Sequence, residues 1–327
     1  MLSKDYLYKT QRGEAVVADS LEYMKEMPDE SADLVITSPP FALQRQKEYG
    51  NVSQDEYVDW LLLFTSEVKR IVKASGSFVI DLGGAYQKNR PVRSLHNYRL
   101  LIRMVDEQGW NLAEEFFWYN PAKLPSPIEW VNKRKIRVKD AVNTVWWMSK
   151  TDTPKTNLKS VLVPYSGRML KLLENSEKFY TPKKRPSGHD ISAGFGNHNG
   201  GAIPPNLLEI PNTDSNSQYL RFCKLAGTKG HPARFPEKLP EFFIKFLTDE
   251  GDLVFDIFAG SNTTGAAAEK LGRRWLAVDM DREYLAASAF RFIEQADEKS
   301  VIRTYQELLN GRTPRFKIPK IRQELFA

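Results

Sequence analysis

Strand-like and helix-like patterns alternate along the first 150 residues of this 327-residue chain and return near its C-terminal end. The first series contains strand patterns at 33–37 and 77–82 with an amphipathic helix pattern at 55–73 between them. The second series includes a strand pattern at 253–257 followed by a helix pattern at 263–271. Repeated strand–helix units are typical of a parallel sheet that is covered by helices on both faces. We therefore expect an α/β fold whose doubly wound, mostly parallel sheet is assembled from both ends of the chain.

The segment between about residues 151 and 230 lacks this periodicity and accumulates Pro, Gly, Ser and Asn, for example at 185–189 and 194–201. A patternless stretch of this length inside a compact protein is usually functional or disordered. Its scattered Phe, Tyr and Leu residues argue against full disorder. We therefore predict that this segment is an inserted recognition module.

Basic residues outnumber acidic ones by 47 to 41, which gives a formal net charge of +6. They gather in three clusters, at 133–139, at 183–185 and along the tail at 312–322. Each cluster is either a solvated face or part of a surface that binds a polyanion. Together with an aromatic content of 12%, the clusters favour nucleic acid as the partner.

Cysteine and histidine usage excludes several classes of protein. Cys223 is the only cysteine, so a disulfide within the chain is excluded, and we interpret it as a small buried side chain. The four histidines lie far apart without metal-ligand spacing, so no metal is expected. Because no stretch approaches 18 apolar residues and the start lacks a signal pattern, we expect a soluble, cytoplasmic protein with no membrane contact.

Ser38-Pro39-Pro40-Phe41 directly follows the strand pattern at 33–37. The two prolines fix φ and remove two N–H donors, so that backbone carbonyls face outward at this strand end. A hydroxyl, exposed carbonyls and an aromatic ring form a rigid ledge. Such a ledge can accept hydrogen bonds from an amino group on a flat ring, as found on cytosine and adenine, while the aromatic ring stacks. A plain turn after the strand is the alternative interpretation.

A strand end, a tight loop and a helix start are combined within residues 256–265. Small residues let the backbone approach a ligand closely, and the first N–H groups of a helix attract an anionic group. Asp279 ends the next strand about 20 residues later, where an acid can accept hydrogen bonds from both hydroxyls of a ribose. The segment lacks both the Gly-Lys-Ser/Thr of phosphate loops and the three-glycine dinucleotide fingerprint. It indicates a nucleoside-bearing ligand, with a turn that binds nothing as the alternative.

Together the two segments resemble the amino-directed DNA methyltransferases that use S-adenosylmethionine, in the permuted (beta-class) order with the catalytic segment first. Ser-Pro-Pro-Phe is the form typical of members that methylate the N4 amine of cytosine, whereas adenine-directed members more often begin with Asp or Asn and end with Tyr. The likeness continues through 41–51, 123–130 and 185–190, and so covers nearly the whole chain. It implies a Rossmann-like methyltransferase fold, S-adenosylmethionine as cofactor and S-adenosylhomocysteine as product.

The resemblance also implies a division of the chain into functional parts. Residues 1–150 are expected to form the catalytic half of the α/β domain, with the target-base pocket. Residues 151–230 would be the target-recognition module, and residues 231–311 the cofactor-binding half of the same domain. Residues 312–327 form a basic tail outside the resemblance.

Cofactor-binding residues follow from the resemblance position by position. The segment 256–265 is similar to the methionine-binding segment of the family, with Asn262 in place of its usual second glycine. Asp279 stands at the ribose position and Asp19 at the position that meets the adenine. The segment 231–236 resembles the one that closes over the methionine end. The predicted cofactor-binding residues are Asp19, His231, Pro232, Asp256, Phe258, Gly260, Ser261, Asn262, Thr263, Thr264 and Asp279.

A methyl group on a sulfonium is already activated, so catalysis consists mainly of aligning the amine and making its lone pair available. We assign the acceptance of the amine's hydrogens to the Ser38 hydroxyl and the Pro39 carbonyl, and stacking on the flipped base to Phe41. Asp81 follows a strand and either receives a proton from Ser38 or only caps the turn. The predicted catalytic residues are Ser38, Pro39, Pro40, Phe41 and Asp81.

DNA contacts are predicted from three places in the chain. Trp118 ends a strand where the family lines its target-base pocket, with a buried core position as the alternative. The basic run from Lys133 suits phosphates, which should make binding dependent on salt. Side chains of the module would reach base edges. The predicted DNA-binding residues are Trp118, Lys133, Arg134, Lys135, Arg137, Arg185 and His189.

The resemblance implies the modification half of a bacterial or archaeal restriction–modification system acting on double-stranded DNA. If the likeness extends to specificity, the target is the inner cytosine of CAGCTG, with a separately encoded endonuclease as functional partner. Adenine N6 or RNA remains an alternative target for the same chemistry. A catalytically silent DNA-binding protein is the alternative from another class, and it predicts degraded segments, whereas both are intact here. A ring-carbon methyltransferase needs a Pro-Cys nucleophile, a context that Cys223 lacks.

Overall fold

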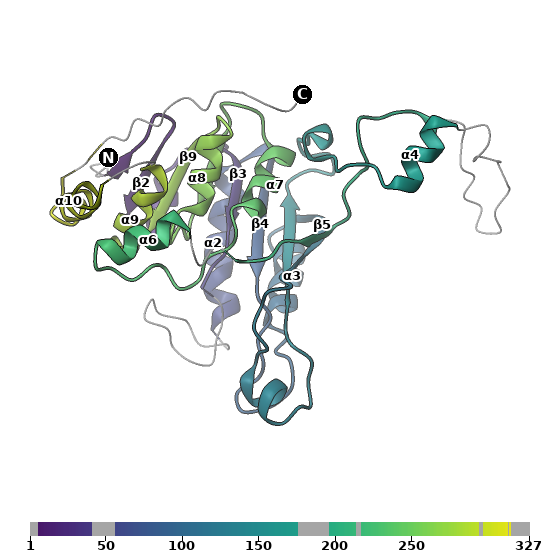
Figure 1. The fold of residues 1–327 in the computed structure, drawn as a ribbon, viewed down its shortest axis with the longest axis horizontal. Helices are drawn as coiled ribbons and strands as arrows, with labels where there is room; N and C mark the ends of the chain where they lie inside the picture. The colour runs from purple at the N-terminus through teal and green to yellow at the C-terminus, as the bar shows by residue number, and fades with distance from the viewer. Residues whose placement is uncertain are drawn as a thin grey trace. The chain divides into compact units, whose positions relative to one another are not determined.

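The computed structural model describes residues 6–40, 56–175, 196–213, 217–293, 297–312 and 314. Within them a nine-stranded sheet runs in the order β1-β2-β9-β8-β3-β4-β6-β5-β7 (Figure 1). The strands are β1 Tyr6–Lys9, β2 Gly13–Val17, β3 Ala32–Thr37, β4 Val72–Leu82, β5 Asn111–Tyr119, β6 Val142–Ser149, β7 Leu207–Glu209, β8 Leu253–Asp256 and β9 Arg274–Asp279.

Nine α-helices are found in the described residues. They are α1 Ser20–Lys25, α2 Tyr57–Ile71, α3 His96–Asp106, α4 Gly167–Glu174, α6 Gln218–Leu225, α7 Lys238–Leu247, α8 Thr263–Lys270, α9 Arg282–Ser288 and α10 Glu298–Leu309. Shorter helical turns are η1 Glu129–Lys133, η2 Leu158–Val161 and η5 Ala289–Phe292. None of the helices in the described segments has the length and apolar character that crossing a bilayer requires.

The central block of the sheet is parallel and is built from both ends of the chain. β2, β9, β8, β3 and β4 pair in parallel, while β6 runs antiparallel to both β4 and β5. β3 and β8 are direct neighbours, with Leu34 opposite Val254 and Val35 opposite Phe255. The predicted α/β fold with a doubly wound, mostly parallel sheet is thereby confirmed.

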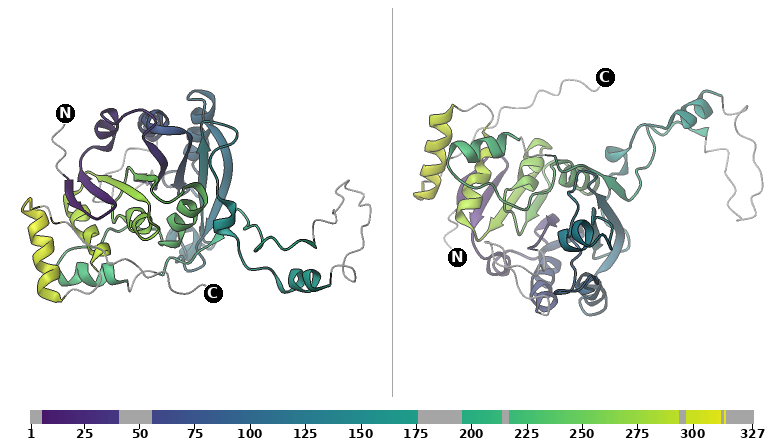
Figure 2. Two further views of the ribbon diagram at one scale, coloured as in Figure 1. Left: turned by 90° about the horizontal axis from the view of Figure 1, so that it is seen from above. Right: turned by 60° about the horizontal axis from the view of Figure 1, so that its bottom comes forward.

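Alternation along the strands sends successive side chains to opposite faces of the sheet. Val35 joins one buried cluster with residues of α1, α2 and α3, whereas Leu34 and Ile36 join a second cluster with residues of α6 to α10. The views in Figure 2 show the purple and blue helices and the green and yellow helices on opposite faces of the sheet. A strand that is buried on both faces therefore reads as the continuous apolar run seen at 33–37.

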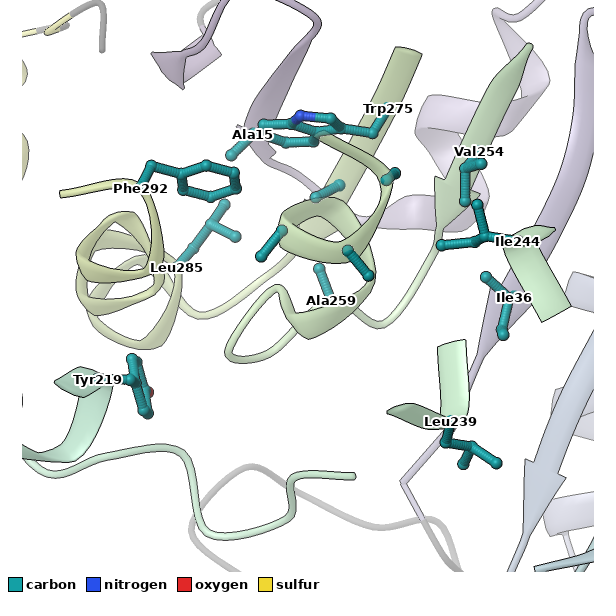
Figure 3. Packing of buried hydrophobic residues seen from close by; sticks show 14 of the residues in the cluster. Ala15, Ile36, Tyr219, Leu239, Ile244, Val254, Ala259, Trp275, Leu285 and Phe292 are labelled. Carbon is teal, nitrogen blue, oxygen red and sulfur yellow. The ribbon is translucent and has the colours of Figure 1, made fainter. Parts of the chain in front are cut away.

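Close packing in the second cluster is dominated by aromatic and small side chains (Figure 3). The Trp275 ring stacks on Phe292 with ring centroids 5.1 Å apart and an interplanar angle of 14°. The alanines of α8 allow this helix to lie close to the sheet, because they add little volume between the two backbones. The result is a rigid support for the loop that precedes α8.

The chain divides into two compact units, Met1–Thr156 with Asn206–Ala327, and Asn157–Pro205. In the smaller unit Ser166 caps α4 by accepting a hydrogen bond from the Met169 N–H at 3.2 Å. The Tyr165 hydroxyl accepts a hydrogen bond from the Asn199 N–H at 2.7 Å. Residues 206–230, including β7 and α6, belong to the larger unit. The smaller unit is therefore shorter than the module predicted at 151–230. The recognition role of the module remains a prediction.

Candidate active site

A cavity of about 910 Å³ lies in the larger unit at the carboxyl ends of the parallel strands. Pro40, which follows β3, and Gly260, which follows β8, both line it, because parallel neighbours end at the same edge of the sheet. The structure thus brings together two segments that lie 220 positions apart in sequence. The predicted site residues that line this cavity are Asp19, Ser38, Pro39, Pro40, Asp81, Trp118, His231, Pro232, Phe258, Gly260, Ser261, Thr263 and Asp279.

Ser38 and Asp81 meet inside the cavity. The Ser38 hydroxyl donates a hydrogen bond to Asp81 Oδ2 at 3.1 Å, and Asn143 Nδ2 donates one to Asp81 Oδ1 at 3.0 Å. Burial raises the pKa of Asp81 from its ordinary 3.8 to about 6, although both hydrogen bonds and the charge of Lys123 act in the opposite direction. At neutral pH the carboxyl group is still mostly ionised, and it is a stronger base than an exposed aspartate.

Asp256 is buried beneath the loop after β8 and is not among the residues that line the cavity. It accepts hydrogen bonds from the Thr37 hydroxyl at 2.7 Å, the Thr264 hydroxyl at 2.6 Å and the Phe258 N–H at 3.2 Å. Burial raises the pKa of Asp256 to about 6. Both Asp256 and Thr264, which the sequence predicts as cofactor-binding, therefore hold the loop in shape from below.

Asn262 adopts a left-handed conformation with φ of 50°, which asparagine tolerates better than most residues. Its side chain caps α8 by accepting a hydrogen bond from the Gly265 N–H at 3.0 Å and donates to the Tyr8 hydroxyl at 2.9 Å. Asn262 is fully buried and lies outside the cavity lining. Asparagine thus adopts the left-handed backbone conformation that a glycine would adopt at this position.

Gly260 also has positive φ, 49°, and it packs against the ring of His231. A Cβ atom added at Gly260 would lie 2.9 to 3.1 Å from three atoms of that ring. The His231 ring is held by contact of Nδ1 with the Ala233 carbonyl at 2.6 Å and packs edge-on against Tyr284 at 4.7 Å. Glycine therefore lets the 231–236 segment close over the loop.

Asp279 ends β9 at the cavity wall and is tied to the same loop. Its carboxylate accepts hydrogen bonds from the Gly260 N–H at 2.7 Å and from the Asp281 N–H at 2.9 Å. Burial raises the pKa of Asp279 above its ordinary value. Asp19 lies on the same cavity, where its carboxylate also caps α1 through the N–H groups of Leu21 and Glu22.

An aromatic wall completes this side of the cavity. The Phe258 ring lies 5.7 Å from Trp60 and 5.0 Å from Phe64, and all three residues line the cavity. The sequence predicts Trp60 and Phe64 only as part of the apolar stripe of a helix, so their place in the site was missed. Flat aromatic surfaces, the acid Asp279 and a glycine-containing loop fit a nucleoside-bearing ligand in a cavity of this size.

Polar side chains and Trp118 also line the cavity, and several of the polar ones were not predicted. Trp118 is buried, and its ring N–H donates to the Ile210 carbonyl at 2.8 Å while the residue lines the cavity. The Asn120 side-chain oxygen accepts hydrogen bonds from the Ala122 and Asn212 N–H groups, both at 3.1 Å. The cavity residues that sequence analysis did not assign to the site include Lys123, Asn143 and Asn212.

The remaining predicted site residues lie elsewhere. Lys133 and Arg134 are exposed on and just after η1, where each pairs with Glu129 at 3.3 Å, and Lys135 and Arg137 follow them on the surface. None of the four lines the cavity. The other predicted positions, Phe41, Arg185 and His189, lie outside the described residues. In the described part of the chain, no cluster of three or more His, Cys, Asp or Glu side chains is arranged to hold a metal ion.

Comparison with known proteins identifies close and distant relatives. A family model for N6/N4 methyltransferases, described as DNA methylase, matches residues 32–290. The type II methyltransferase M.PvuII of Proteus hauseri is 61% identical over 307 residues, which cover 94% of this chain and 91% of that protein. The DNA adenine methyltransferase YhdJ of Escherichia coli is 25% identical over 82% of this chain and 78% of its own length.

Solved structures agree with these sequence relationships. The structure of PvuII DNA methyltransferase, described as cytosine-N4-specific, superimposes with a TM-score of 0.79 and 51% identity, covering 98% of this chain and 99% of the other. TTHA0409 of Thermus thermophilus, a putative DNA modification methylase by its own description, has a TM-score of 0.51 at 19% identity over 91% of this chain and 95% of the other. This second likeness concerns the fold alone.

Proposed function

The chain belongs to the N6/N4 DNA methylase family, and from this premise we propose that it is a site-specific DNA methyltransferase. It transfers a methyl group from S-adenosylmethionine to the exocyclic N4 amine of cytosine in duplex DNA. The observation that carries this proposal is the shared cavity, which Ser38-Pro39-Pro40, the loop residues from Phe258 to Ser261 and Thr263 line together. The cytosine-N4 description of the 51% identical structural relative favours cytosine over adenine.

S-Adenosylmethionine supplies a methyl group that its positively charged sulfur already activates. In this chain Asp279 would accept hydrogen bonds from the ribose hydroxyls, and the aromatic wall of Phe258 and Trp60 would hold the adenine near Asp19. The N-terminal end of α8, with Ser261 and Thr263 on the cavity, would hold the methionine carboxylate. Asp256, Asn262 and Thr264 support this loop from below, and His231 with Pro232 would close the methionine end.

The target cytosine would lie against the ledge after β3. The Ser38 hydroxyl oxygen and the Pro39 carbonyl accept hydrogen bonds from the N4 amine, which draws the nitrogen lone pair out of conjugation with the ring. The nitrogen then forms its bond to the methyl carbon while the carbon–sulfur bond breaks, its electron pair remaining on sulfur. One amine proton passes through the Ser38 hydroxyl to the Asp81 carboxylate. The Phe41 ring would stack on the cytosine.

Access to the cavity requires the cytosine to leave the duplex, which costs its stacking and pairing energy. Trp118 and Asn120 would line the pocket that receives the base. The exposed side chains of Lys133, Arg134, Lys135 and Arg137 would contact phosphates, which position the duplex without reading its sequence. Base-edge contacts are assigned to Arg185 and His189 in the recognition module.

We further propose CAGCTG as the recognition sequence, with methylation of its inner cytosine. Methylation there would protect the DNA of a bacterial or archaeal cell from a separately encoded endonuclease, and the enzyme would act in the cytoplasm where that DNA lies. The 61% identity to the type II methyltransferase M.PvuII supports a role in modification.

Plasmid DNA and labelled S-adenosylmethionine provide the direct test. After incubation, the DNA is digested to nucleosides and the labelled product is identified by mass spectrometry. N4-Methylcytosine is expected, and mapping should place it within CAGCTG. N6-Methyladenine would overturn the cytosine assignment and favour the adenine chemistry of relatives such as YhdJ. Absence of label in DNA would contradict the methyltransferase function itself.

A further inference from the structure

Asn143 is the second hydrogen-bond donor to Asp81, and its sequence context gives no sign of this. We propose that Asn143 is a positioning residue for methyl transfer, whose side-chain amide orients the Asp81 carboxylate toward Ser38 and keeps it ionised. The inference rests on the proposed function, because it concerns the proton acceptor of that reaction.

The register of the sheet explains how Asn143 reaches Asp81. Asp81 on β4 is paired with Val145 on β6, and Asn143 lies two residues before Val145, on the same face of the strand. Diagonal neighbours of this kind are within reach across an antiparallel pair. Trp118 on β5 is paired with Asn143 and therefore shares this face. Asp81, Asn143 and Trp118 all line the cavity.

The two hydrogen bonds divide the carboxylate between two roles. Asn143 Nδ2 donates to Oδ1 at 3.0 Å, which leaves Oδ2 for the Ser38 hydroxyl at 3.1 Å. A primary amide donates hydrogen bonds but does not take up a proton near neutral pH, so Asn143 cannot intercept the proton that Ser38 passes on. Because Asn143 is 8% exposed and Asp81 is 5% exposed, water competes little for this contact.

The hydrogen-bond donors, the charged group and the titratable hydroxyl around Asp81 come from four places in the fold. Ser38 follows β3, Asn143 lies on β6, Tyr57 begins α2, and Lys123 follows β5. Of these, Lys123 and the two hydrogen-bond donors favour the ionised carboxylate, whereas burial opposes it. Loss of the Asn143 donor should therefore raise the pH at which Asp81 loses its proton.

Single-turnover methyl transfer measured from about pH 5 to 9 tests this role in the Asn143→Ala and Asn143→Asp variants. The acid limb of the rate profile should move up by about one pH unit in Asn143→Ala, which loses one charge-assisted hydrogen bond. It should move further in Asn143→Asp, which keeps the side-chain volume but adds a second carboxylate beside Asp81. Dissociation constants for S-adenosylmethionine and DNA should stay close to those of the wild type.

Thr144→Ala is the matched control, because Thr144 is the next residue on β6, points to the other face and does not line the cavity. Its acid limb should coincide with that of the wild type. If the acid limbs of both Asn143 variants also coincided with that of the wild type, the inference would be overturned. The proposed function would be unaffected as long as the wild type transferred methyl groups.

Titration of the Asp81 carboxyl carbon by ¹³C NMR gives a second measurement that needs no turnover. The resonance is assigned by its absence in Asp81→Asn. Its midpoint should be about one unit higher in Asn143→Ala than in the wild type. Equal midpoints in Asn143→Ala and the wild type would overturn the inference, whether or not the wild type is active. A wild type without methyl transfer would separately contradict the proposed function.

Discussion

Thr37 donates a hydrogen bond to Asp256 at 2.7 Å, and this contact joins the end of the strand before the catalytic ledge to the end of the strand before the cofactor loop. The two residues are 219 positions apart and are 1% and 2% exposed. Because Ser38 follows Thr37 directly and Phe258 donates its N–H to the same carboxylate oxygen, Asp256 links the two halves of the site.

Replacement of Thr37 by valine should therefore lower both stability and activity. The variant removes a buried donor to a carboxylate, which should reduce the free energy of unfolding by about 1–3 kcal/mol. S-Adenosylmethionine binding should weaken as the loop above Asp256 loosens. Urea denaturation and isothermal titration calorimetry measure the two effects. Thr37→Ser keeps the hydroxyl and should retain most of both properties. Equal losses in the serine and valine variants would show that the hydroxyl contact is not the cause.

Asp81→Asn should abolish most methyl transfer while making the protein more stable above pH 6. Burial raises the pKa of folded Asp81 from 3.8 to about 6, so the native state keeps a proton that the unfolded state releases between these values. The free energy of unfolding consequently falls as pH rises through this window and stays low above it. Asp81→Asn is neutral and therefore does not lose the roughly 1–3 kcal/mol of unfolding free energy that the wild type loses in this window.

Urea denaturation at about pH 4 and pH 7.5 measures this effect of Asp81→Asn. The advantage of the variant should be small at the lower pH and complete at the higher one. Asp256, whose pKa is also raised to about 6, contributes the same pH dependence to both proteins and cancels from the comparison. A variant that is more stable by the same amount at both pH values would contradict this explanation.

Gly260→Ala should impair cofactor binding more than backbone strain alone explains. The added Cβ would meet the His231 ring at 2.9 Å, and φ is 49°. Gly227→Ala is a matched control, since its φ is 69° and a Cβ there meets nothing within 4 Å. Both variants should lose about 1–2 kcal/mol of stability from left-handed strain. Only Gly260→Ala should also weaken S-adenosylmethionine binding, by about tenfold or more, an effect of about 1.4 kcal/mol.

Calorimetric titration with S-adenosylmethionine and thermal unfolding separate these two effects. If Gly227→Ala weakened cofactor binding to the same degree, a general loss of stability would be the cause. The collision with His231 would then carry no part of the explanation.

Lys135→Gln should weaken DNA binding by the same factor on CAGCTG and on unrelated duplexes. Lys135 is exposed on the surface that follows η1, and loss of one phosphate contact should reduce the slope of log K against log salt by about one. Fluorescence anisotropy at several salt concentrations measures this slope. Lys299→Gln, an exposed charge on α10, serves as the control and should leave the slope unchanged. An unaltered slope in Lys135→Gln would remove this lysine from the phosphate-binding surface.

Periodicity and local chemistry alone determined much of this protein. The apolar run at 33–37 predicts β3, and it is continuous because every residue of β3 is buried. The ten residues from Asp256 predict a strand end, a tight loop and a helix start in the observed order. Local signals of this kind predicted the fold class and a nucleoside-bearing ligand. The family and its methyl donor followed from the resemblance of the two segments to the amino-directed DNA methyltransferases, and the comparisons confirm the family.

Tertiary structure decided which side chains of these segments face the cavity. The chain changes from strand to loop to helix between Asp256 and Thr264, so no single period holds there. The sequence therefore could not show that Asp256, Asn262 and Thr264 turn inward while Ser261 and Thr263 line the cavity. Asn143 could not be identified either, because its role depends on the register between β4 and β6, whose paired residues Asp81 and Val145 are 64 positions apart. Long-range pairing of this kind is set by packing of the whole sheet, which leaves no local trace in the chain.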